Sequence, residues 1–242
     1  NFISNRFKDD YFKFMNYGYY NEELDISLEK NDELERYPIQ LYHHLCIQTE
    51  LKDKIIVEVG SGRGGGANFI ARYHSPKLIT GVDLSPNAVS LCNETYNLDN
   101  LNFLVGDSAN LPFDDNSVDV VVNVESSHCY PSITDFISEV CRVLKPGGHL
   151  LYCDLVIDSS LDGHLNKLKN NSLKDFQHVD ITENIIKASE LMTDDRNDII
   201  NKVGSNFLRN VLKSFASVKG SKIYKSFVNR HYRYISLITQ KK

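Results

Sequence analysis

The chain has 242 residues, of which 41% are hydrophobic and 24% are charged, and its formal net charge is −5. This length suits one α/β domain, or one domain with an insertion. The acidic balance speaks against a nucleic acid partner, because no basic field is present to attract a phosphate backbone. No apolar run approaches the ~20 residues that a membrane span needs, so we expect no membrane span.

The cysteine pattern indicates a reducing environment. The five cysteines are widely spaced and include no CxxC pair: Cys46, Cys92, Cys129, Cys141 and Cys153. This odd number is typical of free thiols in an intracellular protein, not of a disulfide scaffold. The first residues, "NFISNRFKDD", lack the apolar core of a signal peptide. We therefore expect a cytoplasmic protein; a trimmed targeting segment and the oligomeric state, homodimer included, are left open.

Residues 1–50 are predicted to form an N-terminal helical cap. They begin with a polar and aromatic region that contains the patch "YFKFMNYGYYNEE". One helix is expected over 31–51, because Leu34, Tyr37, Leu41, Leu45 and Ile47 approximate helical spacing.

Residues 51–157 alternate between strand and helix patterns. Strands are expected at 54–60, 77–85, 101–107, 118–125 and 149–157. One intervening helix begins well at Ser85-Pro86, and another, "SITDFISEVCRVLKPGG", ends at the Pro-Gly-Gly at 146–148. This alternation predicts an α/β fold with a parallel sheet and helices on both faces.

Residues 158–203 interrupt this rhythm, and we expect them to form a lid insertion over the sheet edge. Their one predicted helix, 181–192, begins with a capping-box pattern of Asp180 and Glu183. Residues 204–242 then complete the core sheet, with a helix at 204–215 and strands at 217–224 and 231–240. Too few residues separate these two strands for a parallel crossover, so we expect them to pair antiparallel.

A glycine loop, "VEVGSGRGGG", follows the first strand, and Gly60, Gly62 and Gly65 in it satisfy GxGxxG. Glycines allow a tight turn and a close approach of the backbone to a ligand. The pattern fits NAD, FAD or S-adenosylmethionine, or a tight turn with no ligand. Asp83 lies 23 residues after Gly60, where a carboxylate can accept both ribose hydroxyls of any of these cofactors.

Two other acids discriminate among the cofactors. Glu58 lies inside the first strand, where a carboxylate would repel a pyrophosphate but suits an ammonium and a sulfonium. Asp107 ends the third strand, where it can accept from the exocyclic amine of adenine; its alternative role is a turn cap. Together they favour S-adenosylmethionine.

Four segments carry a family resemblance: "VEVGSGRGG", "GVDLSPNAVSLC", "FLVGDSANLPFDDNSVDVVVNVESSHCYP" and "EVCRVLKPGGHLLYCDL". In this order and spacing, over roughly 50–157, the chain resembles class I S-adenosylmethionine-dependent methyltransferases. It is most similar to the small-molecule branch of ubiquinone, sterol, sugar and phthiotriolone-type enzymes. The resemblance implies a Rossmann-like seven-stranded sheet of order 3-2-1-4-5-7-6, with only strand 7 antiparallel.

The resemblance also implies a set of cofactor contacts, which are Gly60, Gly62, Asp83, Leu84, Asp107, Ser108, Asn123, Val124 and Glu125. In that arrangement the two glycines approach the methionine and ribose, Asp83 holds the ribose, and Leu84 packs on adenine. Asp107 and Ser108 face the adenine edge. Asn123 or Val124 meets the methionine amino group through its backbone.

The aromatic patch "FMNYGYY" matches a family segment that folds over the cofactor. We expect Tyr17 or Tyr19 to close the site, since a tyrosine there can hydrogen-bond a carboxylate and exclude water. The alternative is a segment that packs its aromatic side chains against its own domain.

A catalytic pair is predicted at the ends of the fourth and fifth strands. His128 follows the fourth strand and Asp154 ends the fifth, at the carboxyl edge where such sheets bind ligands. Methyl transfer to a hydroxyl needs alignment and removal of a proton, for which imidazole is the usual group near neutral pH. In the sugar O-methyltransferases of this branch such a His and Asp are the proposed catalytic pair. The alternative is a histidine that only belongs to a loop.

Ser127, Cys129 and Tyr130 are expected to contact the acceptor. Cys129 is not expected to be a nucleophile, because methyl transfer needs no covalent intermediate. The acidic run at 114–116 resembles a magnesium site, but it fits a solvated turn, and we predict no metal.

We therefore expect an S-adenosylmethionine-dependent O-methyltransferase that releases S-adenosylhomocysteine. Its acceptor would be a hydroxyl of a small, partly apolar metabolite such as a polyketide, phenol, lipid or sugar. N- or C-methylation, a non-catalytic S-adenosylmethionine-binding module and an NAD-binding protein are the alternatives.

Overall fold

A seven-stranded sheet forms the centre of the computed structural model, which describes residues 13–202 and 217–242. Its strands are β1 (Ile55–Val59), β2 (Leu78–Asp83), β3 (Leu101–Val105), β4 (Val118–Val124), β5 (Leu144–Ile157), β6 (Leu173–Asp180) and β7 (Tyr232–Lys241). They are ordered β3-β2-β1-β4-β5-β7-β6. The pairs from β3 to β5 are parallel, and β7 is antiparallel to both of its neighbours. The predicted class, strand order and antiparallel seventh strand are confirmed.

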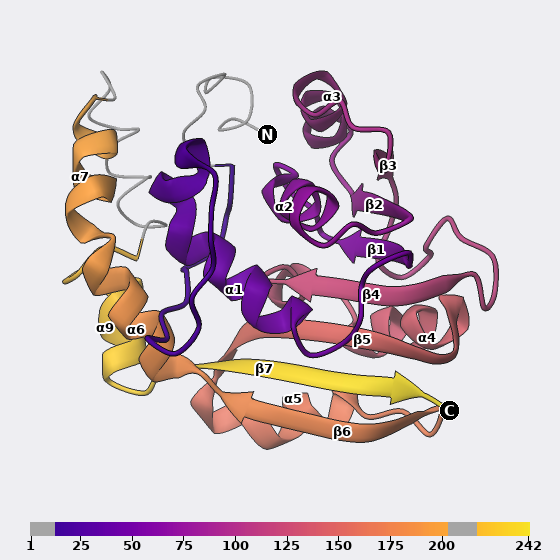
Figure 1. Ribbon diagram of the computed structural model, residues 1–242. Coiled ribbons are helices and arrows are strands. Elements are labelled where there is room, and N and C mark those ends of the chain that lie inside the picture. The colour runs from indigo at the N-terminus through magenta and orange to yellow at the C-terminus, as the bar shows by residue number, and fades with distance from the viewer. Residues whose placement is uncertain (1–12, 203–216) are drawn as a thin grey trace.

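Helices cover both faces of the sheet (Figure 1). One face carries α1 (Arg36–Cys46), α2 (Gly65–Tyr73) and α3 (Pro86–Thr95), and the other carries α4 (Ile133–Val143) and α5 (Leu161–Leu168). Neighbouring residues of β1 serve the two cores, since Ile56 packs in the first and Val57 in the second. This follows from strand geometry, in which successive side chains point to opposite faces.

The sixth strand is β6, at Leu173–Asp180, and the prediction of a strand at 217–224 was wrong. Residues Lys222–Val228 form helix α9 instead, with Ser221 as its cap. Residues 158–202 thus supply a strand, a short 3₁₀ helix (Asp158–Ser160) and three α-helices, α5, α6 (Thr182–Leu191) and α7 (Thr193–Lys202). The helix predicted at 204–215 lies outside the described residues.

Two predicted helix boundaries also differ. Residues Lys30–Glu35 form a short 3₁₀ helix before α1, and Leu34 and Ile47 are exposed. The capping box at α6 does not form: Asp180 accepts from the backbone N–H of Thr182, one residue beyond the cap, and Glu183 pairs with Arg230.

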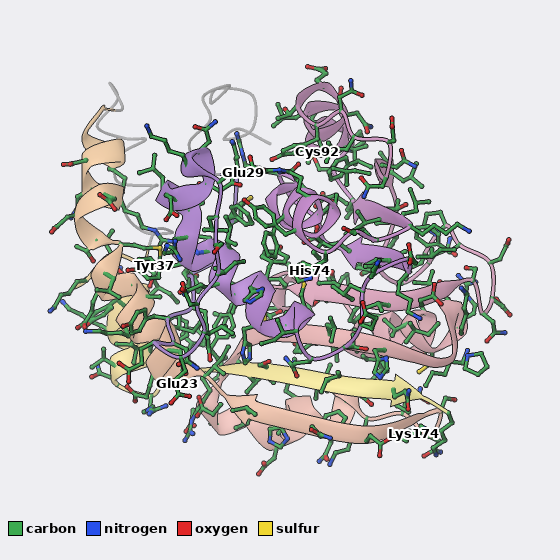
Figure 2. All side chains as sticks on the ribbon, viewed as in Figure 1. Glu23, Glu29, Tyr37, His74, Cys92 and Lys174 are labelled. Atoms are coloured by element: carbon green, nitrogen blue, oxygen red, sulfur yellow. The ribbon has the colours of Figure 1, made fainter. Side chains whose placement is uncertain are left out.

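The parallel strands end on the side where α6, α7 and α9 lie, as the arrowheads of β1, β2 and β4 in Figure 1 show. The N-terminal segment, residues 13–35, reaches the same region. Its Tyr20 backbone N–H donates to Asn184 O in α6 at 3.3 Å. At its other end Glu29, labelled in Figure 2, pairs with Arg72 of α2 at 2.5 Å. The segment is therefore held by contacts with both α2 and α6.

Candidate active site

A cavity of about 660 Å³ lies at the carboxyl ends of the parallel strands. Its wall combines the strand ends with the N-terminal segment and α7. Twelve of the residues predicted from the sequence line it: Tyr17, Gly60, Gly62, Asp83, Leu84, Asp107, Ser108, Val124, Glu125, His128, Cys129 and Tyr130. Five others, Tyr19, Glu58, Asn123, Ser127 and Asp154, are buried behind this wall. The topology thus brings most of the predicted residues together in one place.

The glycine loop is held between the ends of β2 and β4. Gly60 has a φ of +77°, and its N–H donates to Val82 O at 2.8 Å. A Cβ on Gly60 would lie 2.4 Å from the Ser126 hydroxyl, so any side chain there would displace the β4 corner. Gly62, with a φ of +53°, donates its N–H to Asp83 at 2.8 Å. Both positions require glycine, one for space and conformation and the other for conformation.

Asp83 is oriented by two backbone donors. Its two carboxylate oxygens accept from the N–H groups of Gly62 at 2.8 Å and Ser85 at 2.9 Å. Each carboxylate oxygen has two lone pairs, so acceptor capacity remains on the cavity side. Next to it Leu84 is 71% exposed. An acceptor beside an exposed apolar side chain matches the predicted contacts with ribose and adenine.

Asp107 performs its alternative role while it lines the cavity. One carboxylate oxygen accepts from the N–H of Ala109 at 2.9 Å and stabilises the turn after β3. Ser108 lies beside it in the same wall. The turn-cap role therefore does not exclude the predicted contact with the cofactor.

Glu58 does not line the cavity, so the structure does not support direct contact with a cofactor. Its carboxylate lies beneath the loop and accepts from the Tyr42 hydroxyl at 2.6 Å. A Cβ on Gly66 would lie 2.4 Å from the same carboxylate. Burial raises the pKa of Glu58 to about 7, although hydrogen bonds from Tyr42 and the Ala67 backbone oppose this shift.

The two predicted tyrosines lie in different environments. Tyr17 lines the cavity, and its ring packs edge-on against Phe227 at 5.5 Å. Tyr19 is 4% exposed and stacks on His44 at 4.5 Å. Tyr17 is thus the tyrosine in position to close the site, and Tyr19 packs in the core as the alternative interpretation expected.

Asn123 and Tyr130 build the β4 corner. The Asn123 side-chain nitrogen lies 2.8–2.9 Å from Val59 O, the Ser126 hydroxyl and the Tyr130 hydroxyl. Asn123 is fully buried and does not line the cavity, whereas Val124, the alternative for the predicted cofactor contact, does line it. The Tyr130 hydroxyl is engaged in this cluster, and its ring contributes the cavity wall.

His128 and Asp154 form the predicted pair. The imidazole Nδ1 donates to Asp154 at 2.7 Å, and the histidine side chain is 39% exposed while Asp154 is fully buried. Asp154 also accepts from Ser127 Oγ at 2.6 Å and from the backbone N–H groups of His128 and Leu155 at 2.9 and 2.8 Å. The hydrogen bond to Asp154 raises the pKa of His128, against the opposing effect of burial. Ser127 therefore orients Asp154 and does not line the cavity.

Three cavity residues from distant parts of the chain lie close together at the acidic corner after β4. The left-handed Glu125, with a φ of +48°, accepts from the Tyr17 backbone N–H at 2.9 Å. Burial and the nearby charge of Asp154 raise the pKa of Glu125, and Arg196 of α7 opposes the shift. Sequence reasoning missed Arg196, which lines the cavity and donates to Asn16 O at 3.1 Å. Its position depends on the packing of α7, which no sequence pattern signals.

Ser61 is a second residue that the sequence reasoning missed. It lies in the glycine loop between two predicted positions and lines the cavity. Its buried hydroxyl has no hydrogen-bond partner within residues 13–202 and 217–242. Its position within GxGxxG could have identified it, because every residue of such a loop lies near the ligand.

No group of three metal-ligating side chains occurs within the described parts of the chain. In the acidic run at 114–116, Asp115 pairs with Arg142 at 2.9 Å, which fits the predicted turn. Burial and the nearby charge of Asp154 raise the pKa of the Cys129 thiol. No described helix is both long and apolar enough to cross a membrane.

Comparison with known proteins identifies the family. Residues 57–152 match the family model described as a methyltransferase domain. The chain is 36% identical to the fatty-acid O-methyltransferase of Mycolicibacterium smegmatis, over 90% of this chain and 80% of the relative. It is 35% identical to the phthiotriol/phenolphthiotriol dimycocerosates methyltransferase of Mycobacterium leprae, over 91% and 82%.

Solved structures agree in fold. Geranyl diphosphate C-methyltransferase from Streptomyces coelicolor A3(2) has a TM-score of 0.66 at 18% identity, over 93% of this chain and 91% of the other. Phosphoethanolamine N-methyltransferase 2 of Haemonchus contortus has a TM-score of 0.65 at 18% identity, over 83% and 52%. The chain belongs to the class I S-adenosylmethionine-dependent methyltransferases, in their small-molecule branch. It is an enzyme whose cofactor is S-adenosylmethionine.

Proposed function

We propose that the protein methylates a hydroxyl of a small, lipid-like acceptor and that His128 is the general base. The hydrogen bond of 2.7 Å between His128 Nδ1 and Asp154 carries this proposal, because it leaves Nε2 of a cavity-lining imidazole to accept a proton. S-adenosylmethionine supplies the methyl group in an electrophilic form.

The residues of the cavity suit this cofactor. Asp83 offers remaining acceptor capacity to a ribose, and Leu84 offers an exposed apolar surface to a base. The buried hydroxyl of Ser61 has an unused hydrogen-bonding capacity that a bound ligand would satisfy. Tyr17 and Arg196 would cover the cavity from the N-terminal segment and α7 and exclude water. Of the described part of 158–203 only α7 contributes to this cover, while α5 and β6 belong to the sheet and its other face.

His128 would remove the hydroxyl proton as the oxygen is methylated. A neutral imidazole accepts the proton at Nε2, and the buried Asp154 stabilises the resulting positive charge. The carboxylate also fixes the ring orientation, since the neutral tautomer must keep its proton on Nδ1 to donate to Asp154.

A lipid-like acceptor is supported by the cavity and by the relatives. Met15 exposes 69% of its surface, and Phe14 and Pro131 add apolar groups to the wall. The two curated relatives are named for fatty-acid and phthiotriol dimycocerosate substrates. An apolar acceptor buries such surface favourably.

The test is a His128→Ala variant, assayed on a panel of long-chain compounds that carry a free hydroxyl. We expect turnover to fall by about a hundredfold or more, because a general base contributes ~10²–10⁴. S-adenosylhomocysteine should still bind in calorimetry. His178→Ala, which removes an exposed imidazole that does not line the cavity, is the matched control. Unchanged turnover in His128→Ala with intact binding rejects the base.

C-methylation is a second candidate, because the ring of Tyr17 and the side-chain oxygens of Glu125 line the cavity and could stabilise a cationic intermediate. N-methylation needs no strong base and is separated by the same experiment. NMR of the product identifies the methylated atom: a methoxy signal supports the O-methyltransferase, and a methyl on carbon or nitrogen rejects it.

A further inference from the structure

The catalytic pair is one end of a chain of hydrogen-bonded side chains that leads away from the cavity. Ser127 Oγ lies 2.6 Å from Asp154 and 2.7 Å from the Tyr152 hydroxyl. The Tyr152 hydroxyl in turn lies 2.8 Å from Nε2 of His164 in α5. Ser127 and Tyr152 are buried, and His164 does not line the cavity.

This chain of hydrogen bonds has a direction, because the number of protons on each group determines which group donates in each contact. Four N–H and O–H groups converge on Asp154, which is the environment of an ionised carboxylate that only accepts. The one hydroxyl proton of Ser127 is thus used toward Asp154. Tyr152 must then donate to Ser127, and its own oxygen accepts from His164. Nε2 of His164 therefore carries a proton.

The reverse direction would place a proton on Asp154. If Nε2 of His164 accepted, Tyr152 would donate to it and Ser127 would donate to Tyr152. Asp154 would then have to supply the proton for its contact with Ser127. In this arrangement the neutral His164 ring carries its one proton on Nδ1, and Asp154 takes up a further proton from solvent. A neutral Asp154 no longer stabilises a charged His128.

We propose that His164 is a positioning residue for the methyl-transfer reaction: by donating from Nε2 it directs the chain toward Asp154 and keeps that carboxylate ionised beside His128. This inference rests on the proposed function of His128 as the base. Burial raises the pKa of the Tyr152 phenol, which stays a donor. Burial also lowers the pKa of His164, an effect that Lys167 adds to and Asp154 opposes, so the neutral ring is the relevant form.

The variants His164→Gln and His164→Glu test the direction of the chain, because they share one shape. Glutamine can donate to Tyr152, whereas an ionised glutamate can only accept. We expect the Gln variant to stay within about threefold of the wild-type kcat and the Glu variant to lose about tenfold or more, with KM for S-adenosylmethionine unchanged in both.

An NMR titration measures the pKa of His128, and the direction of its shift distinguishes reversal of the chain from a through-space effect of the added charge. An added negative charge at position 164 acting through space raises the pKa of His128. Reversal of the chain requires Asp154 to take up a proton from solvent, and the loss of that negative charge lowers the pKa of His128. This is the result we expect for His164→Glu. An unchanged or raised pKa in that variant overturns the proposal.

Tyr152→Phe is the matched control, because it cuts the chain and keeps the ring. In this background the Gln and Glu variants should differ by less than about twofold in kcat; a difference as large as that with Tyr152 present also overturns the proposal. The titration uses the free enzyme and does not depend on which group is the base. If His128→Ala kept its turnover while the titration behaved as expected, the chain would stand and the base assignment would fail.

Discussion

The backbone N–H of Tyr17 donates to the carboxylate of Glu125 at 2.9 Å, although 108 positions separate the two residues in the chain. This bond ties the N-terminal segment to the corner after β4, and both residues line the cavity. The segment therefore covers the cofactor side of the cavity through a partly buried hydrogen bond, a kind of bond that contributes about 0.5–1.5 kcal/mol.

Replacement of Glu125 by Ala should weaken cofactor binding. We expect the Kd for S-adenosylhomocysteine to rise about tenfold, which corresponds to ~1.4 kcal/mol, because Tyr17 loses its acceptor. Calorimetry measures the change. Glu183→Ala, which removes an exposed carboxylate on α6, is the control and should bind normally. Equal affinities in the two variants would show that the Tyr17 contact does not hold the segment closed.

The five parallel strands, β1 to β5, could be predicted because each contains an apolar run, nearly continuous where the strand is buried. The edge strand β6 could not, since Leu173 is its one buried residue and the rest of "LKDFQHVD" is partly or fully exposed. Conversely "KIYKSFV" resembles a strand in composition, but Ser221 caps it as helix α9. At both places tertiary packing and capping overrode the local pattern.

The residues of the site could be predicted to a similar extent as the strands. Parallel strands end at one edge, so Asp83, Asp107 and His128 had to meet there. Sequence does not tell which side a residue near a strand end faces. For this reason Ser127 was assigned to the acceptor, whereas it supports Asp154. Arg196 comes from a helix whose packing no periodicity encodes.

The pH dependence of kcat/KM should report His128. Because the hydrogen bond to Asp154 raises the pKa of His128 above 6.5, the reactive neutral imidazole forms only at higher pH. Activity should therefore rise through an acid limb that lies above pH 6.5. The Asp154→Asn variant loses the negative charge that raises the pKa of His128, while burial still lowers that pKa. The acid limb should therefore move to lower pH, and the plateau of activity should fall roughly a hundredfold. Rates measured from pH 5 to 9 decide this, and a limb that stays in place would contradict the pairing.

Stability should depend on Glu58. Its folded pKa of about 7 lies above the ordinary 4.5, so the carboxyl is more stable protonated in the fold. The resulting stability is present below pH 4.5 and is lost as the pH rises through 7. Wild type should therefore lose roughly 3 kcal/mol relative to Glu58→Gln between pH 5 and 8. Urea unfolding at several pH values measures the difference. Glu22→Gln, at an exposed position, should show no such trend, and parallel curves for wild type and Glu58→Gln would disprove the assignment.

Three glycine substitutions can separate steric clash from backbone strain. A Cβ at Gly60 would lie 2.4 Å from Ser126, and the backbone of Gly60 has a φ of +77°. At Gly220 the φ is +87° and nothing lies within 4 Å, and Gly163 in α5 has open space and no positive φ. We expect Gly60→Ala to abolish S-adenosylhomocysteine binding, Gly220→Ala to lose about 1 kcal/mol of stability with binding intact, and Gly163→Ala to gain ~1 kcal/mol. Thermal unfolding and calorimetry measure these effects. If Gly60→Ala bound the cofactor product as tightly as Gly220→Ala, close packing of the loop against the β4 corner would not be what forms the site.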